Sequence, residues 1–100
     1  LSFSKAKIKA FAIRFLDYRC LHYDKDLFLA FNDVLKKKDS VLTSDMMSIN
    51  PMFEKGLLID ELGNLVQKNL FSYNPVTGEY KPQGHSIKLG LELYCKDYAI

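Results

Sequence analysis

Four side chains in this sequence have the chemistry of metal ligands or nucleophiles, but their spacing argues against such a site. They are Cys20, His22, His85 and Cys95. A structural zinc ion needs about four ligands, which usually occur as closely spaced pairs. These four are scattered along the chain without local pairs. We therefore expect no metal site and no cofactor.

The sequence also lacks a convincing acid–base pair. The only histidine with carboxylates close to it in sequence is His22, near Asp24 and Asp26. All three fall in a segment predicted to connect two helices, where side chains are normally solvated. General acid–base catalysis instead needs a group whose pKa is tuned by its surroundings. We identify no catalytic residue and expect that the protein is not an enzyme.

Length and composition predict one domain over residues 1–100, because 100 residues can bury a single core. No apolar run approaches the roughly 18–20 residues that a membrane span needs. The N-terminus lacks a secretory signal pattern, and two cysteines do not make a disulfide scaffold. We expect an intracellular protein, cytoplasmic or nuclear. The first residue is Leu rather than Met, which leaves room for flanking domains in a longer chain.

Charge is distributed unevenly along the sequence. Residues 1–38 hold nine Lys or Arg against four Asp, a net charge of +5, whereas residues 39–100 have a net charge of −3. A basic first third can attract polyanions. The three consecutive lysines at 36–38 have a simpler explanation, because cations at the end of a helix suit its dipole.

Two amphipathic helices are predicted in the first third. Ser4 is the expected N-cap of a helix that extends to about His22. Its apolar stripe is broad, which predicts a helix covered on more than one side. The residues of that stripe are Ile8, Phe11, Ala12, Ile13, Phe15, Leu16, Arg19 and Cys20. A second helix should run from about Asp24 to Lys38.

A short helix and a longer one should follow. Thr43 or Ser44 is the expected cap of the short helix, after an extended piece at 41–42. The pair Asn50–Pro51 is typical of an N-cap followed by Pro at the first helical position. The longer helix is therefore expected to start near Pro51, or to restart after Gly56, and to run to Lys68. Periodicity predicts one shared buried cluster: Phe11, Phe15, Phe31, Leu35, Leu62, Leu65 and Val66.

The end of the longer helix leads into a predicted β-hairpin. Asn69 stands where a helix stop needs a residue that tolerates positive φ. Segments 70–73 and about 79–82 should pair antiparallel across the turn at 74–78, which is rich in turn-forming residues. Segment 87–98 has both the alternation of a strand and the spacing of a helix capped by Ser86. We favour the helix.

This order of elements carries a family resemblance. The relevant residues are Leu62, Leu65, Val66, Leu70 and Phe71, then Gly78 and Tyr80, then Ser86, Leu89, Gly90 and Leu93. In this pattern residues 43–98 resemble the winged helix-turn-helix family of bacterial and archaeal regulators, with Asn69 in place of a glycine and a wing lengthened at 82–84. The resemblance implies a mostly α fold with a small antiparallel hairpin. It also implies DNA binding, in transcription regulation or replicon maintenance.

On that reading the longer helix enters the major groove of double-stranded DNA. Its residues outside the core are Asp60, Glu61, Asn64, Gln67 and Lys68. Asn64 and Gln67 have the chemistry to read adenine edges, and Lys68 and Lys81 could contact phosphates. Two outward carboxylates would oppose such binding.

The alternative is a winged-helix module that binds protein, as a homodimer or as part of a larger assembly, without contacting DNA. Residues 87–98 are predicted to carry more apolar surface than one small domain can cover. Surface of that kind usually marks an interface. The expected contact residues are Ile87, Leu91, Leu93, Tyr94 and Tyr98.

Overall fold

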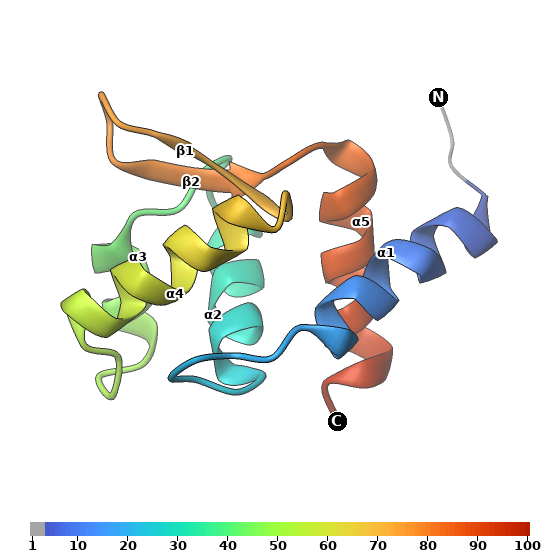
Figure 1. Cartoon of the computed structure of the whole chain (residues 1–100), viewed down its shortest axis with the longest axis horizontal. Coiled ribbons are helices and arrows are strands. Elements are labelled where there is room, and N and C mark those ends of the chain that lie inside the picture. Colours follow the sequence, from blue (N-terminus) through green and yellow to red (C-terminus); the bar gives the residue numbers. More distant parts are fainter. Residues whose placement is uncertain (1–3) are drawn as a thin grey trace.

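A computed structural model describes residues 4–100 of the chain. The described part is mostly α-helical, with one antiparallel two-stranded sheet (Figure 1). Its elements are α1 (Lys5–Asp17), α2 (Asp26–Leu35), α3 (Thr43–Ile49), α4 (Lys55–Gln67), β1 (Phe71–Asn74), β2 (Glu79–Pro82), α5 (His85–Leu93) and the π-helical turn η1 (Tyr94–Tyr98). This layout is compatible with that of a winged helix.

Helix α1 begins as predicted and ends earlier than predicted. The Ser4 hydroxyl accepts a hydrogen bond from the Lys7 N–H at 3.2 Å, which is the expected cap. The helix ends at Asp17, and an extended Tyr18 starts a loop that reaches Lys25. The broad apolar stripe is not fully covered, because Ile13 is 36% exposed and Leu16 is 49% exposed. The helix is thus covered on more than one side, as predicted, by α5 and by α4, but part of its apolar stripe stays exposed.

The positions of α2, α3 and α4 correct three predicted helix starts. Helix α2 starts at Asp26 rather than Asp24. The N-cap of α3 is Leu42, not Thr43 or Ser44, and the Asp45 carboxylate accepts the Leu42 N–H at 2.9 Å. Helix α4 starts at Lys55, close to the alternative restart at Gly56 and not at Pro51, and Asn50 instead forms a turn in which its side-chain oxygen accepts the Met52 N–H at 3.0 Å.

The predicted left-handed stop after α4 is confirmed. Asn69 has φ of 60°, the one positive value among the described non-glycine residues. The Leu70 N–H donates to the Leu65 carbonyl and the Asn69 N–H to the Val66 carbonyl, both at 3.1 Å. This pair of bonds is the Schellman motif. It turns the chain sharply enough for β1 to begin two residues later.

The hairpin is confirmed, with its first strand shifted by one residue. Phe71 pairs with Pro82 and Asn74 with Glu79. The turn is closed by a 2.7 Å bond from the Gly78 N–H to the Asn74 carbonyl, and Gly78 adopts φ of 76°. Val41 adds an antiparallel bridge to Tyr80. The extended piece expected at 41–42 therefore lies along the free edge of β2.

The C-terminal segment is helical, as favoured, and begins after Gly84 rather than at a Ser86 cap. Helix α5 packs closely along α1 (Figure 1). A Cβ placed on Gly90 would lie 2.5 Å from the Phe11 Cβ and 3.0 Å from the backbone at Ala12. Glycine is therefore required here by the short distance between the two helices.

One aromatic-rich core joins these elements. Phe31 stacks on Phe71 with ring centroids 4.1 Å apart, and Phe15 meets Phe28 edge-on at 5.1 Å. Of the predicted cluster, five members are buried: Phe15, Phe31, Leu35, Leu62 and Leu65. The other two, Phe11 and Val66, are partly buried and pack against its edge. The predicted core is thus largely confirmed.

Candidate functional site

An open cleft of about 570 Å³ separates the C-terminal half of α1 from the C-terminal end of α4. Its lining residues are Arg14, Asp17, Tyr18, Arg19, Asn64, Lys68 and Leu70. Three of them are cationic and one is anionic. Two of the predicted site residues, Asn64 and Lys68, therefore share a surface with basic residues of the first third of the chain.

Arg14 connects the two helices directly. Its Nη2 donates a 2.8 Å hydrogen bond to the carbonyl oxygen of Lys68, the C-cap of α4. The guanidinium carbon also lies 5.9 Å from the centre of the Phe11 ring. A cation at this end of α4 is favoured by the helix dipole. A guanidinium has five N–H donors, so this bond leaves most of its donor capacity for another ligand.

Glu61 is not on the outer face of α4, which corrects the sequence-based assignment. It is 0% exposed. Its carboxylate accepts the Tyr18 hydroxyl at 2.8 Å and the backbone N–H groups of Leu21, His22 and Tyr23 at 3.0, 3.0 and 3.3 Å. Burial acts to raise the pKa of Glu61, but these donors outweigh burial and lower the pKa. The charge of Glu61 thus holds the α1–α2 loop against α4.

Tyr18 extends this network to Asn64. The Asn64 Nδ2 donates to the Tyr18 hydroxyl oxygen at 2.8 Å, while that hydroxyl donates to Glu61. Burial and the hydrogen bond to Glu61 raise the pKa of Tyr18. The phenol therefore stays protonated and keeps both bonds. Asn64 is half-buried and already committed to this network, which makes it a poorer reader of base edges than the sequence suggested.

The outer face of α4 includes two glycines and few charged side chains. Gln67 and Lys68 are exposed, as is Asp60. A Cβ added to Gly56 or Gly63 would meet nothing within 4 Å. These two glycines are seven residues apart, so they lie on one side of the helix. Their lack of side chains allows another molecule to approach the α4 backbone closely.

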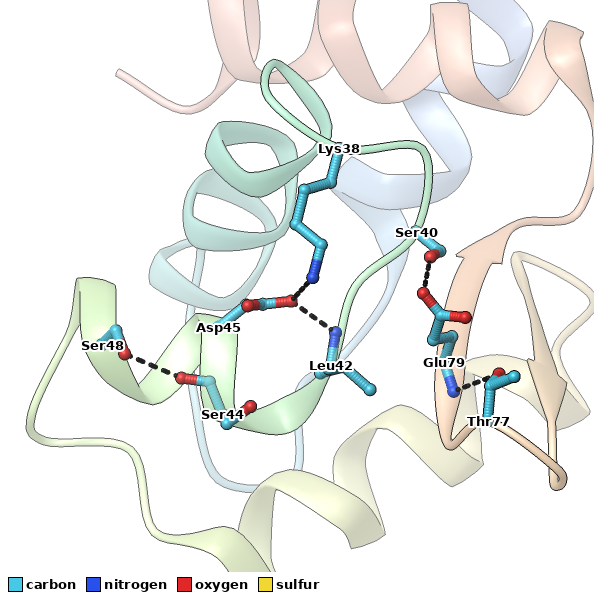
Figure 2. Close-up of polar contacts among 8 residues, drawn as sticks. All are labelled: Lys38, Ser40, Leu42, Ser44, Asp45, Ser48, Thr77 and Glu79. Atoms are coloured by element: carbon cyan, nitrogen blue, oxygen red, sulfur yellow. Dashed lines mark hydrogen bonds and ion pairs between the residues drawn. The ribbon is translucent and has the colours of Figure 1, made fainter.

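Lys81, the predicted wing contact, is exposed on β2 opposite Ser72. It lines a small hollow that also includes Ser40 and Glu79. Figure 2 shows how this end of the hairpin is held: the Ser40 hydroxyl donates to the Glu79 carboxylate, and the Thr77 hydroxyl oxygen accepts the Glu79 N–H at 3.3 Å. The hydrogen bond from Ser40 lowers the pKa of the Glu79 carboxyl. The Ser40 bond holds the turn end of the wing against the segment before α3.

Figure 2 also shows a second set of polar contacts, around α3. The Lys38 Nζ donates to the Asp45 carboxylate at 2.7 Å, and that carboxylate also caps α3 (Figure 2). Lys36 pairs with Asp33 at 3.4 Å. Two of the three consecutive lysines therefore have acidic partners. The hollow that they line, between α2 and α3, is less basic than the sequence implies.

The predicted interface residues lie mostly inside the domain. Ile87, Leu91 and Tyr94 are 6%, 0% and 6% exposed and belong to the core. Leu93 and Tyr98 are partly buried and pack against it. The expectation that 87–98 carries more apolar surface than the domain can cover was therefore wrong for the three buried residues. An interface through them would require the core to open.

Residues 4–100 bring no three His, Cys, Asp or Glu side chains together in a group that could hold a metal ion. Both cysteines are free and partly buried, and burial raises the pKa of each thiol to about 12. Within the described chain, no helix has the length and apolar character to cross a membrane.

Comparison with known proteins adds no relative: no family model, curated protein or solved structure matches the chain. The open cleft between α1 and α4, called the basic cleft from here on, is therefore identified as a candidate site from its geometry alone. Sequence analysis missed Arg14 as a site residue and assigned Arg19 to the core side of α1. The signal that could have found them was the excess of positive charge in residues 1–38.

Proposed function

We propose that the chain is a winged helix-turn-helix domain that binds double-stranded DNA. Helix α4 is the recognition helix and presents Gln67 to base edges in the major groove. Arg14, Arg19 and Lys68 neutralise phosphates beside it, and Lys81 on the wing contacts the neighbouring backbone. Gene regulation or replicon maintenance is the role that this activity would serve.

The observation that carries the proposal is the bond between Arg14 and the C-cap carbonyl of α4. It places Arg14, in the last turn of α1, beside the C-terminal end of the candidate recognition helix. Phosphate neutralisation supplies most non-specific DNA affinity. A recognition helix with few cations of its own therefore needs cations from neighbouring segments, and Arg14 of α1 and Arg19 of the following loop supply them.

The burial of Glu61 also favours DNA binding. With both Asp60 and Glu61 facing outward, α4 would repel phosphates along much of its length. Glu61 is fully buried and satisfied by four donors, so Asp60 is the exposed carboxylate that remains on this helix. Lys55 at its first turn offsets that charge.

Duplex binding measured by fluorescence anisotropy over a series of salt concentrations tests the proposal. Affinity should fall steeply as salt rises, and Arg19→Glu or Lys68→Glu should weaken binding and reduce the salt slope by about one phosphate contact each. Lys96→Glu is the matched control, because Lys96 lines a separate hollow between α2 and α5. Absence of duplex binding at low salt would contradict the proposal.

A protein-binding role is the second candidate, and the exposed apolar side chains around α3 and α4 favour it. Ile49 is 45% exposed, Met52 82% and Ile59 44%. Apolar groups on a surface with little charge suit a protein partner. Arg19→Glu separates the two functions, because it should weaken only DNA binding, whereas Ile59→Glu adds a repulsive charge against either ligand.

A further inference from the structure

We propose that the outer face of α1 binds a second copy of this chain, with the two α1 helices antiparallel about a two-fold axis at Ile13. This inference is independent of DNA binding. Its basis is that the domain buries only part of the broad apolar stripe of α1 and leaves the rest exposed.

Two faces of α1 already have partners within the chain. Ala12 and Phe15 are buried in the core, and Phe11 lies against Gly90 of α5. Arg14 and Tyr18 face α4 through the bonds described above. The third face is exposed and consists of Ala6, Lys9, Ala10, Ile13, Leu16 and Asp17. At 100° per residue, all six lie within about 60° of Ile13 on the helix.

The order of residues on this face makes it complementary to itself. Lys9 and Asp17 each lie four residues from Ile13, on opposite sides of it. When two copies run antiparallel about Ile13, each Lys9 faces Asp17 of the other copy. Ala10 then faces Leu16, a small residue against a large one, and Ile13 meets its own symmetry mate. A two-fold interface requires this kind of self-complementary pattern.

A parallel arrangement would instead place Lys9 against Lys9 and Asp17 against Asp17, which like-charge repulsion disfavours. The charge pattern therefore favours a second copy of this chain as the partner, with its α1 antiparallel to the first. Close packing against α5 holds α1 in place, so the exposed face is already formed in one copy.

The size of the face sets the expected strength of association. A 13-residue helix is about 20 Å long, and one pair of such helices buries less than the roughly 1,200–2,000 Å² of a standard interface. We expect a reversible dimer that dissociates in the micromolar range. In a DNA complex, such a dimer would present two recognition helices.

Sedimentation equilibrium of the 100-residue chain, from about 10 to 500 micromolar, measures this association. Ile13→Glu should weaken it about tenfold or more. Val76→Glu, at an exposed valine in the hairpin turn, is the matched control and should leave it unchanged. Circular dichroism melting of each variant confirms that it folds, since all these side chains are exposed. A wild-type chain that stays monomeric throughout, or association that Ile13→Glu leaves intact, would overturn the proposal.

Charge exchange tests the antiparallel direction. Lys9→Asp alone should weaken association, because it places a carboxylate opposite Asp17 of the second copy. Asp17→Lys alone should do the same through paired cations. The double variant Lys9→Asp/Asp17→Lys should recover most of the wild-type association. Failure of the double variant to recover, when both single variants weaken the dimer, would overturn the antiparallel register.

Discussion

The hydroxyl of Tyr18 donates a 2.8 Å hydrogen bond to the carboxylate of Glu61, which joins the end of α1 to the middle of α4. Three consecutive backbone N–H groups, at residues 21–23, complete the coordination of that carboxylate. Successive N–H groups of this kind form an anion-binding concavity. Here the chain fills it with its own carboxylate, which sets the position of Arg14 and Arg19 beside α4.

Replacing Glu61 should therefore destabilise the whole domain. Glu61→Gln removes the charge and turns an NH₂ group toward donors, which should lower the free energy of unfolding by about 1.5–3 kcal/mol. Chemical denaturation measures the loss. Asp60→Asn is the matched control on the same helix and should change stability by less than about 0.5 kcal/mol, because Asp60 is exposed. Equal effects from the two substitutions would contradict the role assigned to Glu61.

Stability should also depend on pH through Glu61. Its folded-state pKa lies below the ordinary value of 4.5, so the unfolded chain takes up the proton first as pH falls. The stabilisation is then complete above about pH 4.5 and is lost as pH falls through the folded pKa. Denaturation midpoints from pH 7 to pH 3 measure this dependence. Glu61→Gln should flatten the acid limb, and an unchanged slope in that variant would assign it to other carboxylates.

Sequence analysis predicted the backbone conformation more accurately than the positions of individual polar side chains. Asn69, the hairpin turn and the helical spacing of Leu62 and Leu65 each depend on local conformation, and all three were confirmed. Glu61 could not be assigned this way. Its partners are Tyr18 and backbone groups about 40 positions earlier in the chain. No local sequence pattern indicates that a carboxylate will bind such a distant loop.

The same limit explains the errors on amphipathic faces. Periodicity identifies which residues share a side of α1, but it does not say how many neighbours cover that side. Ile13 and Leu16 belong to the predicted stripe and remain exposed, whereas Leu91 and Tyr94 were assigned to an interface and are buried. The basic cleft was missed because Arg14 meets Lys68 only in three dimensions.

Asn69 offers a test of the left-handed stop after α4. Asn69→Ala should lower the free energy of unfolding by about 1 kcal/mol, because a Cβ disfavours positive φ and alanine lacks the local hydrogen bonding of Asn. Asn69→Gly should match or exceed the wild type, since glycine adopts this conformation without steric cost. Thermal or chemical denaturation distinguishes them. If both variants lost the same stability, the side chain rather than the backbone angle would be responsible.

Gly90 tests the close packing of α5 on α1. Gly90→Ala places a methyl group 2.5 Å from the Phe11 Cβ, and the helices must separate to accept it. Overpacking of this kind should cost about 1–3 kcal/mol, measured by denaturation. An alanine tolerated without loss would mean that α1 and α5 can shift apart freely, and would weaken the argument that α1 presents a preformed outer face.

Gly63 on α4 has open space around it, unlike Gly90. Replacing it therefore tests the effect on stability and the effect on DNA binding separately. A methyl group there meets nothing within 4 Å, so Gly63→Ala should raise the free energy of unfolding by about 0.5–1 kcal/mol through helix propensity. If α4 lies in the major groove with this face toward the bases, the same methyl group should weaken duplex binding severalfold at constant salt. Denaturation and anisotropy on one protein sample measure both effects. Greater stability with unchanged DNA affinity would show that the glycine face of α4 does not contact the duplex, and would move recognition to the α1 cleft and the wing.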